Sequence, residues 1–255
     1  MAKKKSSELK IPNGKSFLFP IIKVLVMKAV YKKPKVINLA GEVEKTAIVV
    51  ANHASMSGPP SLHLYYPNVT CKWGAGEMFG NHKMRKEYLR DILYIKKRHL
   101  KPGFATSFKA WLFAWLNPIV YRGMRNIPTF TDARLLNTIK VSTRVLTQTD
   151  MSIMVYPENS NSGYFDVMTE FFPGFVMLAN NYYRVTGKDL PVYPVYFSTK
   201  KHIMVIGKPL YVQDMVKQGM NRYQIAEVYK NEVNKLYFDH VEKAEVYNYK
   251  KDKQK

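Results

Sequence analysis

The sequence predicts an α/β fold, in which a single domain holds a mainly parallel central sheet flanked by helices. Short apolar runs with strand character alternate along the chain with longer runs that have helical spacing, and this alternation is typical of a layered parallel sheet. A chain of 255 residues, 46% of them hydrophobic, is long enough to bury the core of such a domain. Polar residues suited to chemistry follow several of the apolar runs, as expected where parallel strands end.

The individual elements follow from these patterns. Five runs rich in β-branched and aromatic residues are expected to form strands, namely Thr46–Ala51, Val69–Trp73, Ser152–Tyr156, Val192–Phe197 and Ile203–Ile206. Six longer segments are expected to form helices, over 16–31, 85–94, 104–116, 131–147, 170–186 and 221–239. In the last of these the apolar residues share one face, and Asn221 is expected to cap its start. A further helix is expected to begin at Pro59 and Pro60.

The charge of the chain is strongly positive and uneven. Forty lysines and arginines face nineteen acidic residues, for a net charge of +21, and residues 1–35 hold ten lysines against one glutamate. Such charge suits an anionic membrane surface, a nucleic acid or an acidic partner. The chain has no zinc-finger spacing, no RNP-type aromatic strand and no basic-zipper heptads, so we expect no nucleic-acid partner. A basic nucleic-acid-binding protein stays an alternative, as does a surface whose lysines only maintain solubility.

Two segments predict attachment to a membrane surface. In the run Phe17–Lys28, about eleven apolar residues are interrupted by Lys23, which is too short for a transmembrane span and fits an amphipathic helix in the interface. A second segment, 108–116, carries Trp111 and Trp115, and tryptophan favours membrane interfaces. We therefore expect a peripheral or monotopic protein on the cytoplasmic face of the membrane. For the first segment, a buried core helix with lysines at its edge is the alternative.

The expected organisation has three parts. They are a basic, amphipathic, membrane-associating N-terminal segment over residues 1–40, one α/β domain over 41–240 and a charged tail over 241–255. The single cysteine, Cys71, excludes an internal disulfide and leaves too few thiolates for a zinc or iron–sulfur site. A reducing location on the cytosolic side fits this cysteine content.

Reactive residues follow two of the apolar runs. Asn52 and His53 come directly after the first strand, where a histidine can act as a general base near neutral pH. Arg122 closes the apolar run 118–121, which we interpret as a strand, and a guanidinium is well shaped to fork onto a phosphate. Structural explanations stay open for both side chains, as a core histidine and as a salt-bridged arginine.

A carboxylate and a polar loop follow the strand that is expected over Ser152–Tyr156. Glu158 comes first, and the small residues after it leave backbone N–H groups free for a polar or anionic headgroup. The loop residues expected to bind substrate are Asn159, Ser160 and Asn161.

Taken together, these blocks resemble the glycerolipid acyltransferases typified by 1-acylglycerol-3-phosphate acyltransferase. That family has, in order, N-H-x-x-x-x-D, an apolar strand closing in arginine, F-P-E-G-T-R and a V-P-V-x-P-V-like strand. The matching positions here are Asn52-His53, Arg122, Tyr156–Asn161 and Leu190–Val195, and Gly76–Phe79 resembles the family's K-E-L-F stretch. The resemblance runs from about residue 40 to about residue 210.

The resemblance implies an O-acyltransferase that works at a membrane surface. It implies transfer of a fatty acyl group from acyl-CoA or acyl carrier protein to a hydroxyl of a lysophospholipid or related glycerolipid, with His53 as general base. It also implies that the acceptor headgroup is held by Asn52, Arg122, Glu158 and the loop 159–161. No cofactor beyond the acyl donor and no metal is implied.

The chain departs from the family pattern in three places. The aspartate of the first block falls on Gly58, which leaves Glu77 as the nearest family-aligned carboxylate to support His53, and Gly58→Asp is expected to raise the rate. The glycine and arginine of the third block are both replaced by asparagine, which suggests an altered acceptor. Residues 81–110 read as an insertion. A catalytically inactive, lipid-binding relative is therefore the alternative.

Overall fold

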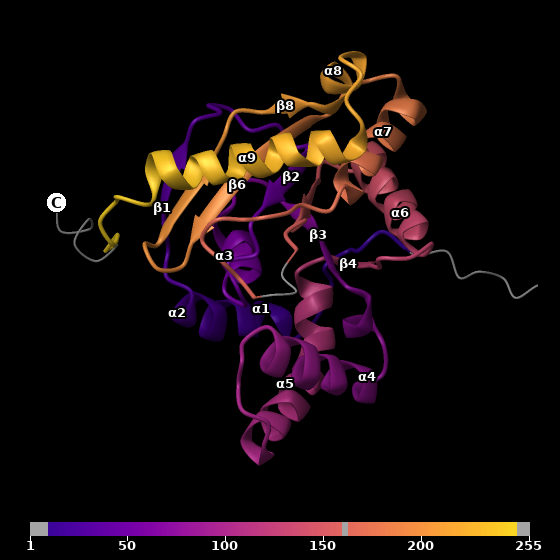
Figure 1. Ribbon diagram of the computed structural model, residues 1–255. Helices are drawn as coiled ribbons and strands as arrows, with labels where there is room; N and C mark the ends of the chain where they lie inside the picture. Colours follow the sequence, from indigo (N-terminus) through magenta and orange to yellow (C-terminus); the bar gives the residue numbers. More distant parts are fainter. Residues whose placement is uncertain (1–9, 160–162, 249–255) are drawn as a thin grey trace, which may run out of the picture.

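The computed structural model describes residues 10–159 and 163–248 of the chain (Figure 1). Its strands form one sheet in the order β1-β7-β6-β2-β5-β3-β4, with β8 paired to β6. Strands β6, β2, β5, β3 and β4 are parallel neighbours, whereas β7 and β8 run antiparallel to β6. The strands are β1 Lys35–Asn38, β2 Ile48–Ala51, β3 Thr70–Ala75, β4 Asn126–Thr129, β5 Ser152–Val155, β6 Pro191–Ser198, β7 Ile203–Ile206 and β8 Leu210–Tyr211. The predicted α/β fold with a mainly parallel sheet is confirmed.

Helices cover both faces of this sheet. Because side chains alternate along a strand, Ile48 and Val50 of β2 join one core and Val49 and Ala51 join another. The first core is closed by α6, α7 and α9, and the second by α3, which supplies Leu62. The bounds are α3 Gly58–Tyr65, α6 Leu135–Gln148, α7 Gly174–Thr186, α8 Val212–Lys217 and α9 Arg222–His240. The centre of the sheet is therefore rigid, and its strand ends are well-defined platforms.

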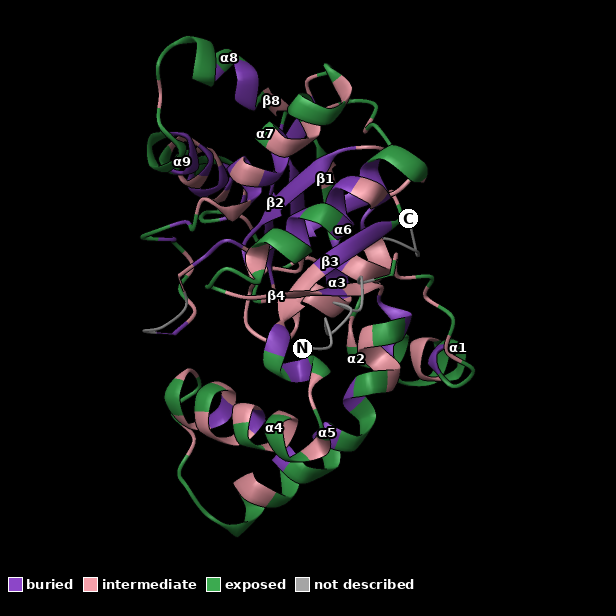
Figure 2. Ribbon diagram, turned by 90° about the vertical axis from the view of Figure 1, so that its right-hand side faces the viewer, coloured by how far each residue is buried: buried purple, intermediate pink, exposed green. Residues whose placement is uncertain are grey.

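A second group of helices forms the lower part of the molecule in Figure 1 and stays largely exposed in Figure 2. The group holds the 3-10 turn η2, helix α4, the π-helix η3, helix α5 and an N-terminal helical segment. Their bounds are η2 Gly76–Phe79, α4 His82–Glu87, η3 Tyr88–Lys96 and α5 Phe104–Gly123, with α1 Phe19–Ile21, η1 Ile22–Met27 and α2 Lys28–Val30 forming the N-terminal segment.

Helix α5 runs on beyond its predicted end and contains Pro118. Proline has no N–H, so the carbonyl of Ala114 lacks its usual helical donor. Arg85 of α4 supplies one instead, since its Nε donates to that carbonyl at 2.9 Å. The run 118–121, interpreted from the sequence as a strand, is therefore helical, and Arg122 lies in the last turn of α5.

The N-terminal helical segment is docked on α5. Phe19, 5% exposed, packs where Gly123 has no side chain, because a Cβ atom at Gly123 would lie 2.0 Å from the Phe19 ring. Met27 packs with Phe19 against Met124. The segment predicted as a helix over 16–31 is helical over residues 19–30 and contributes to the folded structure.

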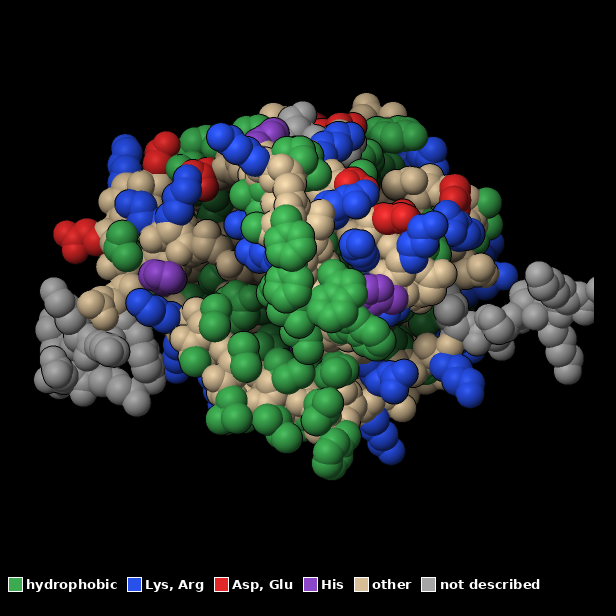
Figure 3. Space-filling view, turned by 90° about the horizontal axis from the view of Figure 1, so that it is seen from below, with side chains coloured by type: hydrophobic (Ala, Val, Ile, Leu, Met, Phe, Trp, Pro, Cys, Tyr) green, Lys and Arg blue, Asp and Glu red, His purple; other side chains and the backbone are tan. Residues whose placement is uncertain are grey.

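The rest of this segment and one side of α5 expose apolar side chains on the underside of the molecule, which Figure 3 shows from below. We call this surface the lower apolar face. Phe17 is 91% exposed and Phe104 86% exposed. The face consists of Phe17, Leu18, Ile21, Val24, Leu25, Val26, Val30, Phe104, Phe108, Trp111, Leu112, Phe113, Trp115 and Leu116. Among the described residues, no helix combines the length and apolar character needed to cross a bilayer.

All five predicted strands are present, with ends that differ by two residues or fewer from the prediction. Strands β1, β4 and β8 were not predicted. β1 is mostly exposed, β4 contains Pro128 and β8 has two residues, so none of them has the pattern of a buried strand.

Candidate active site

The predicted base and carboxylate meet at one edge of the sheet. His53 follows β2 and Glu158 follows β5, and these strands are parallel neighbours. The carboxyl ends of the two strands therefore point the same way, as the sequence predicted. The main-chain N–H of His53 donates to Glu158 Oε2 at 3.0 Å and joins the two strand-end loops.

The His53 ring is enclosed by aromatic side chains. It stacks on Tyr164, with ring centroids 4.9 Å apart, and meets the edge of Tyr156 at 5.2 Å. The pKa of His53 is lowered to about 4, chiefly by burial and in smaller part by the nearby positive charge of Lys97, while the hydrogen bond with Ser55 acts in the opposite direction. The imidazole is therefore neutral at physiological pH, which is the form that accepts a proton.

A main-chain carbonyl orients this ring. His53 Nδ1 lies 2.5 Å from the carbonyl oxygen of Ser55. Since a carbonyl only accepts, Nδ1 carries the hydrogen and Nε2 carries the free lone pair. The backbone brings Ser55 back to the ring by two successive left-handed residues, Ala54 at φ 45° and Ser55 at φ 58°. Such conformations cost about 1–3 kcal/mol each and are concentrated at functional sites.

Gly58 cannot carry the family's aspartate in this loop. A Cβ atom at Gly58 would lie 2.0 Å from the carbonyl oxygen of His53, well inside contact distance. Gly58 is buried at the first turn of α3, just after the loop that carries His53. The expectation that Gly58→Asp raises the rate is therefore wrong, because the side chain would displace His53.

Glu158 acts as a structural anchor for the site. It is 8% exposed, and it accepts main-chain N–H groups from His53 and Phe165. Burial raises the pKa of Glu158, and these two N–H groups oppose the rise. The neighbouring Asn159 donates its side-chain N–H to Glu170 at 2.6 Å. Ser160 and Asn161 lie outside the described residues.

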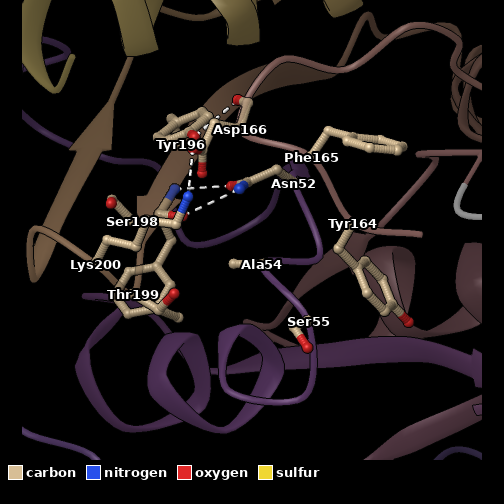
Figure 4. Close-up of a pocket in the computed structure, with 11 residues that line it drawn as sticks. Asn52, Ala54, Ser55, Tyr164, Phe165, Asp166, Tyr196, Ser198, Thr199 and Lys200 are labelled. Carbon is tan, nitrogen blue, oxygen red and sulfur yellow. Dashed lines mark hydrogen bonds and ion pairs between the residues drawn. The ribbon is translucent and has the colours of Figure 1, made fainter. Parts of the chain in front are cut away.

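A pocket of about 140 Å³ opens beside His53, between the ends of β2 and β6. Asn52, Tyr196 and Asp166 lie on one side of it, with Ser55 and Tyr164 opposite (Figure 4). The amide of Asn52 is buried and pairs with the main chain of Phe197 in both directions, at 3.0 and 2.8 Å. Asn52 therefore holds β2 to β6 at the pocket floor.

Two further predicted residues lie elsewhere. Arg122 is exposed at the end of α5, and Glu77 is exposed in η2. Within the part of the chain that the structure describes, no hydrogen bond, ion pair or ring contact joins either side chain to His53. The ring's described partners are Ser55, Tyr156 and Tyr164.

A cation that sequence reasoning left unassigned lies near His53. Lys97, at the end of η3, is half-buried, and its Nζ lies 5.7 Å from the centre of the Tyr164 ring that stacks on His53. Burial lowers the pKa of Lys97, while Glu158 acts in the opposite direction. The next residue, Arg98, reaches Met56 in the loop after His53 at 3.3 Å. The only feature of the sequence that could have indicated a role for Lys97 is the basic run 96–98 inside the segment interpreted as an insertion.

Comparisons with known proteins found similarity among solved structures only. No family model matches the sequence, and no curated protein matches it. The chain is similar to the crystal structure of the 1-acyl-sn-glycerophosphate (LPA) acyltransferase PlsC from Thermotoga maritima. That match has a TM-score of 0.45 and 16% sequence identity, and it covers 86% of this chain and 82% of that chain.

Proposed function

We propose that the protein is an O-acyltransferase that moves a fatty acyl group from a thioester donor to a hydroxyl of a lysophospholipid or related glycerolipid. The observation that carries the proposal is the state of His53. Its Nδ1 is held by the Ser55 carbonyl, which leaves the lone pair of Nε2 to accept a proton, and its chain neighbours Asn52 and Ala54 line a pocket. The order of the motifs in the sequence supports the same reaction class.

In the proposed reaction, Nε2 of His53 takes the proton of the acceptor hydroxyl as its oxygen attacks the thioester carbonyl. A new C–O bond forms, and the tetrahedral intermediate collapses with cleavage of the C–S bond. The protonated imidazole then returns the proton to the leaving thiolate of coenzyme A or acyl carrier protein. The proton and the acyl group are both accounted for, and no redox partner or metal takes part.

The hydrogen-bond partner of the His53 ring is a main-chain carbonyl, and this is expected to make acyl transfer slow. The Ser55 carbonyl fixes the tautomer of the ring as a carboxylate does, but it carries no full negative charge to stabilise the imidazolium. A base with a pKa of about 4 also has less driving force for proton transfer at neutral pH. We therefore expect acyl transfer that is slow but dependent on His53.

Lys97 is the side chain that we assign to the acceptor phosphate. Its ammonium lies over Tyr164 and next to Glu158 and His53, whereas Arg122 lies exposed at the end of α5. A lysine acts on phosphate as a point charge, while an arginine forms a bidentate fork. This difference supports an acceptor other than the one that the arginine motif implies.

Membrane attachment is part of the proposal. The lower apolar face offers aromatic and aliphatic side chains, and lysines flank it along the N-terminal segment at positions 15, 23, 28, 32 and 33. Apolar insertion combined with attraction to anionic headgroups gives the two signals that stable peripheral binding needs. We propose binding to the cytoplasmic face of an anionic membrane, where the lipid acceptor is found.

The test is an acyl-transfer assay with purified full-length protein, using acyl-CoA and acyl carrier protein donors with a panel of lysolipids in anionic vesicles. Native protein is expected to transfer, and His53→Ala is expected to lose at least about a hundredfold in rate. His240→Ala is the matched control, since His240 lies in the last turn of α9, does not line the pocket beside His53 and is not among the described partners of its ring.

One observation favours a second candidate. Among the described residues, no carboxylate contacts the His53 ring, and Gly58 has no room for one. A lipid-binding protein without catalytic activity has the same architecture. Tight binding of a lysolipid, with no transfer from either donor, selects this candidate, whereas transfer by the His53→Ala variant at the native rate removes the catalytic role of His53.

A further inference from the structure

A second pocket lies on the other side of the end of β6. Its volume is about 120 Å³, and Phe197 and Thr199 line both this pocket and the one beside His53. One wall is formed by residues 30–32, where the N-terminal helical segment ends, and another by the first turn of α3. The remaining wall is His202, in the turn between β6 and β7. None of these lining residues belongs to the predicted site.

The pocket is lined mostly by hydroxyl and basic side chains. Four of the eight lining residues carry hydroxyl groups, and two more carry a basic side chain. They are Tyr31, Ser57, Ser61 and Thr199, with Lys32 and His202. No carboxylate lines the pocket among the described residues. A concave site with hydroxyl and cationic donors and no negative charge is complementary to an anion.

Ser61 provides independent support for a ligand. The residue is 3% exposed, and its main-chain N–H is already used in the helix, donating to the carbonyl of Ser57. Its hydroxyl makes no hydrogen bond to any described residue, and it lines the pocket. Ser61 Oγ is not one of the side-chain atoms that are buried without a partner, so water or a ligand in the pocket can reach it. The Ser61 hydroxyl is therefore available to a group that enters the pocket.

We propose that this pocket binds a phosphate group. A phosphate presents several strong acceptor oxygens, so one phosphate can take hydrogen bonds from Ser61, Ser57 and Thr199 while Lys32 supplies charge at the rim. The inference does not depend on the acyl-transfer reaction, because no residue of this pocket takes part in that chemistry.

Two sources can supply such a phosphate. Val30, in the pocket wall, also belongs to the lower apolar face, so the headgroup of an anionic phospholipid in a bilayer can reach the pocket from the membrane side. A soluble phosphate ester, such as the donor's coenzyme A, can enter from water. The recognition chemistry is the same for both, and the experiment separates them.

The experiment measures binding to the full-length protein without any turnover. Inorganic phosphate and coenzyme A are the soluble probes, titrated by calorimetry. Phosphatidylcholine vesicles with and without phosphatidic acid are the membrane probes, read by cosedimentation. The variants are Ser61→Ala and Lys32→Gln, with Lys235→Gln as the matched control that removes the same charge from an exposed position on α9, outside the pocket and outside the lower apolar face.

Ser61→Ala is expected to weaken binding about tenfold or more, as removal of a hydrogen bond to a charged ligand does. It is expected to leave thermal stability unchanged, because the hydroxyl has no protein partner to lose. Lys32→Gln is expected to weaken binding similarly, and Lys235→Gln much less. Weakening with the soluble probes identifies a soluble phosphate ester, and weakening confined to phosphatidic acid vesicles identifies a lipid headgroup.

Native-like affinity of Ser61→Ala for all of the probes overturns the proposal, as does an equal effect of Lys235→Gln and Lys32→Gln. Thr199→Val serves as a second variant if Ser61→Ala fails to fold. A His53→Ala protein that has lost acyl transfer is expected to keep this phosphate binding, which separates failure of the site from failure of the proposed activity.

Discussion

In the loop from His53 to Gly58, main-chain groups hold the reactive side chain, whereas on the lower apolar face large side chains lie exposed with few contacts. The loop uses the Ser55 carbonyl, the carboxylate of Glu158 and a glycine with no room for a Cβ atom. On the lower face, Phe17 and Phe104 are more than four-fifths exposed. The loop therefore depends on exact backbone geometry, while the face depends only on its composition.

This comparison teaches where folding and function are separable. A substitution in the loop alters the path of the backbone, so stability and chemistry change together. A substitution on the lower face removes side chains that are half-exposed or more at most positions, so it is expected to change membrane association much more than stability. The predictions below test this contrast, from the largest expected effect to the smallest.

The largest effect is expected at Gly58. Gly58→Ala places a Cβ atom 2.0 Å from the His53 carbonyl, and Gly58→Asp adds a carboxylate to the same clash. We expect either variant to lower the free energy of unfolding by about 3 kcal/mol or more, with loss of any acyl transfer. Urea unfolding followed by circular dichroism measures this.

Gly103→Ala is the control for Gly58, because a Cβ atom there meets nothing within 4 Å and its backbone is extended. It is expected to unfold like the native protein. If Gly58→Ala has native stability, the loop has room for a Cβ atom at position 58. The loop would then not differ from the lower face in its sensitivity to substitution.

The next effect concerns the lower apolar face. The double variant Phe104→Ser and Phe108→Ser removes two stacked rings that are 86% and 52% exposed. Because burying one such side chain contributes about 1.5–3 kcal/mol, we expect affinity for anionic vesicles to fall on the order of a hundredfold, with only a small loss of thermal stability from the half-buried Phe108. Vesicle cosedimentation and a thermal scan measure the two quantities.

Phe238→Ser, on α9 at the opposite side of the molecule in Figure 1, is the matched control, since Phe238 is also exposed, at 47%. It should leave vesicle binding unchanged. Undiminished binding of the double variant would exclude this face as the attachment surface. Deleting residues 1–35 is a poorer test, because it also removes the buried Phe19 and Met27.

A smaller effect is expected at Lys97. Lys97→Met removes the cation near His53, so the Michaelis constant of a phosphate-bearing acceptor should rise about tenfold, with little change in kcat. Lys96→Met removes an equal charge from the neighbouring exposed position and should change neither. Steady-state kinetics with varied acceptor distinguish the two variants. Equal Michaelis constants for all three proteins would limit Lys97 to packing against Tyr164.

The smallest effect is a shift in the pH profile. The base acts in its neutral form, and burial lowers the pKa of His53 to about 4, so the imidazole stays neutral as the pH falls below 6. We expect kcat/KM to be nearly constant from pH 7 to about pH 5 and to be halved near pH 4. An exposed histidine would lose half its activity near pH 6.5. A midpoint close to 6.5 would show that solvent reaches the ring.

The parts of this protein that the sequence determines are those with a local pattern. The sequence predicts both the first and the last residue of the fully buried strand Ile203–Ile206, because a short, continuous apolar run is typical of a buried strand. The cap of α9 was also predictable, since Asn221 accepts from the main chain of Tyr223 and Gln224. His53 and Glu158 were placed together correctly because parallel neighbours end at the same edge.

The rest was decided by contacts between residues far apart in the chain, which leave no periodic signal in either segment. The run 118–121, expected as a strand, continues helix α5, and Arg85 donates to the carbonyl that Pro118 leaves without a helical partner. Lys97 reaches the site only because η3 packs beside the loop after β5. At position 58, the sequence shows a missing carboxylate. Only the tertiary structure explains it, because the loop folds so tightly that His53 takes a main-chain carbonyl as its partner and leaves no space for a side chain.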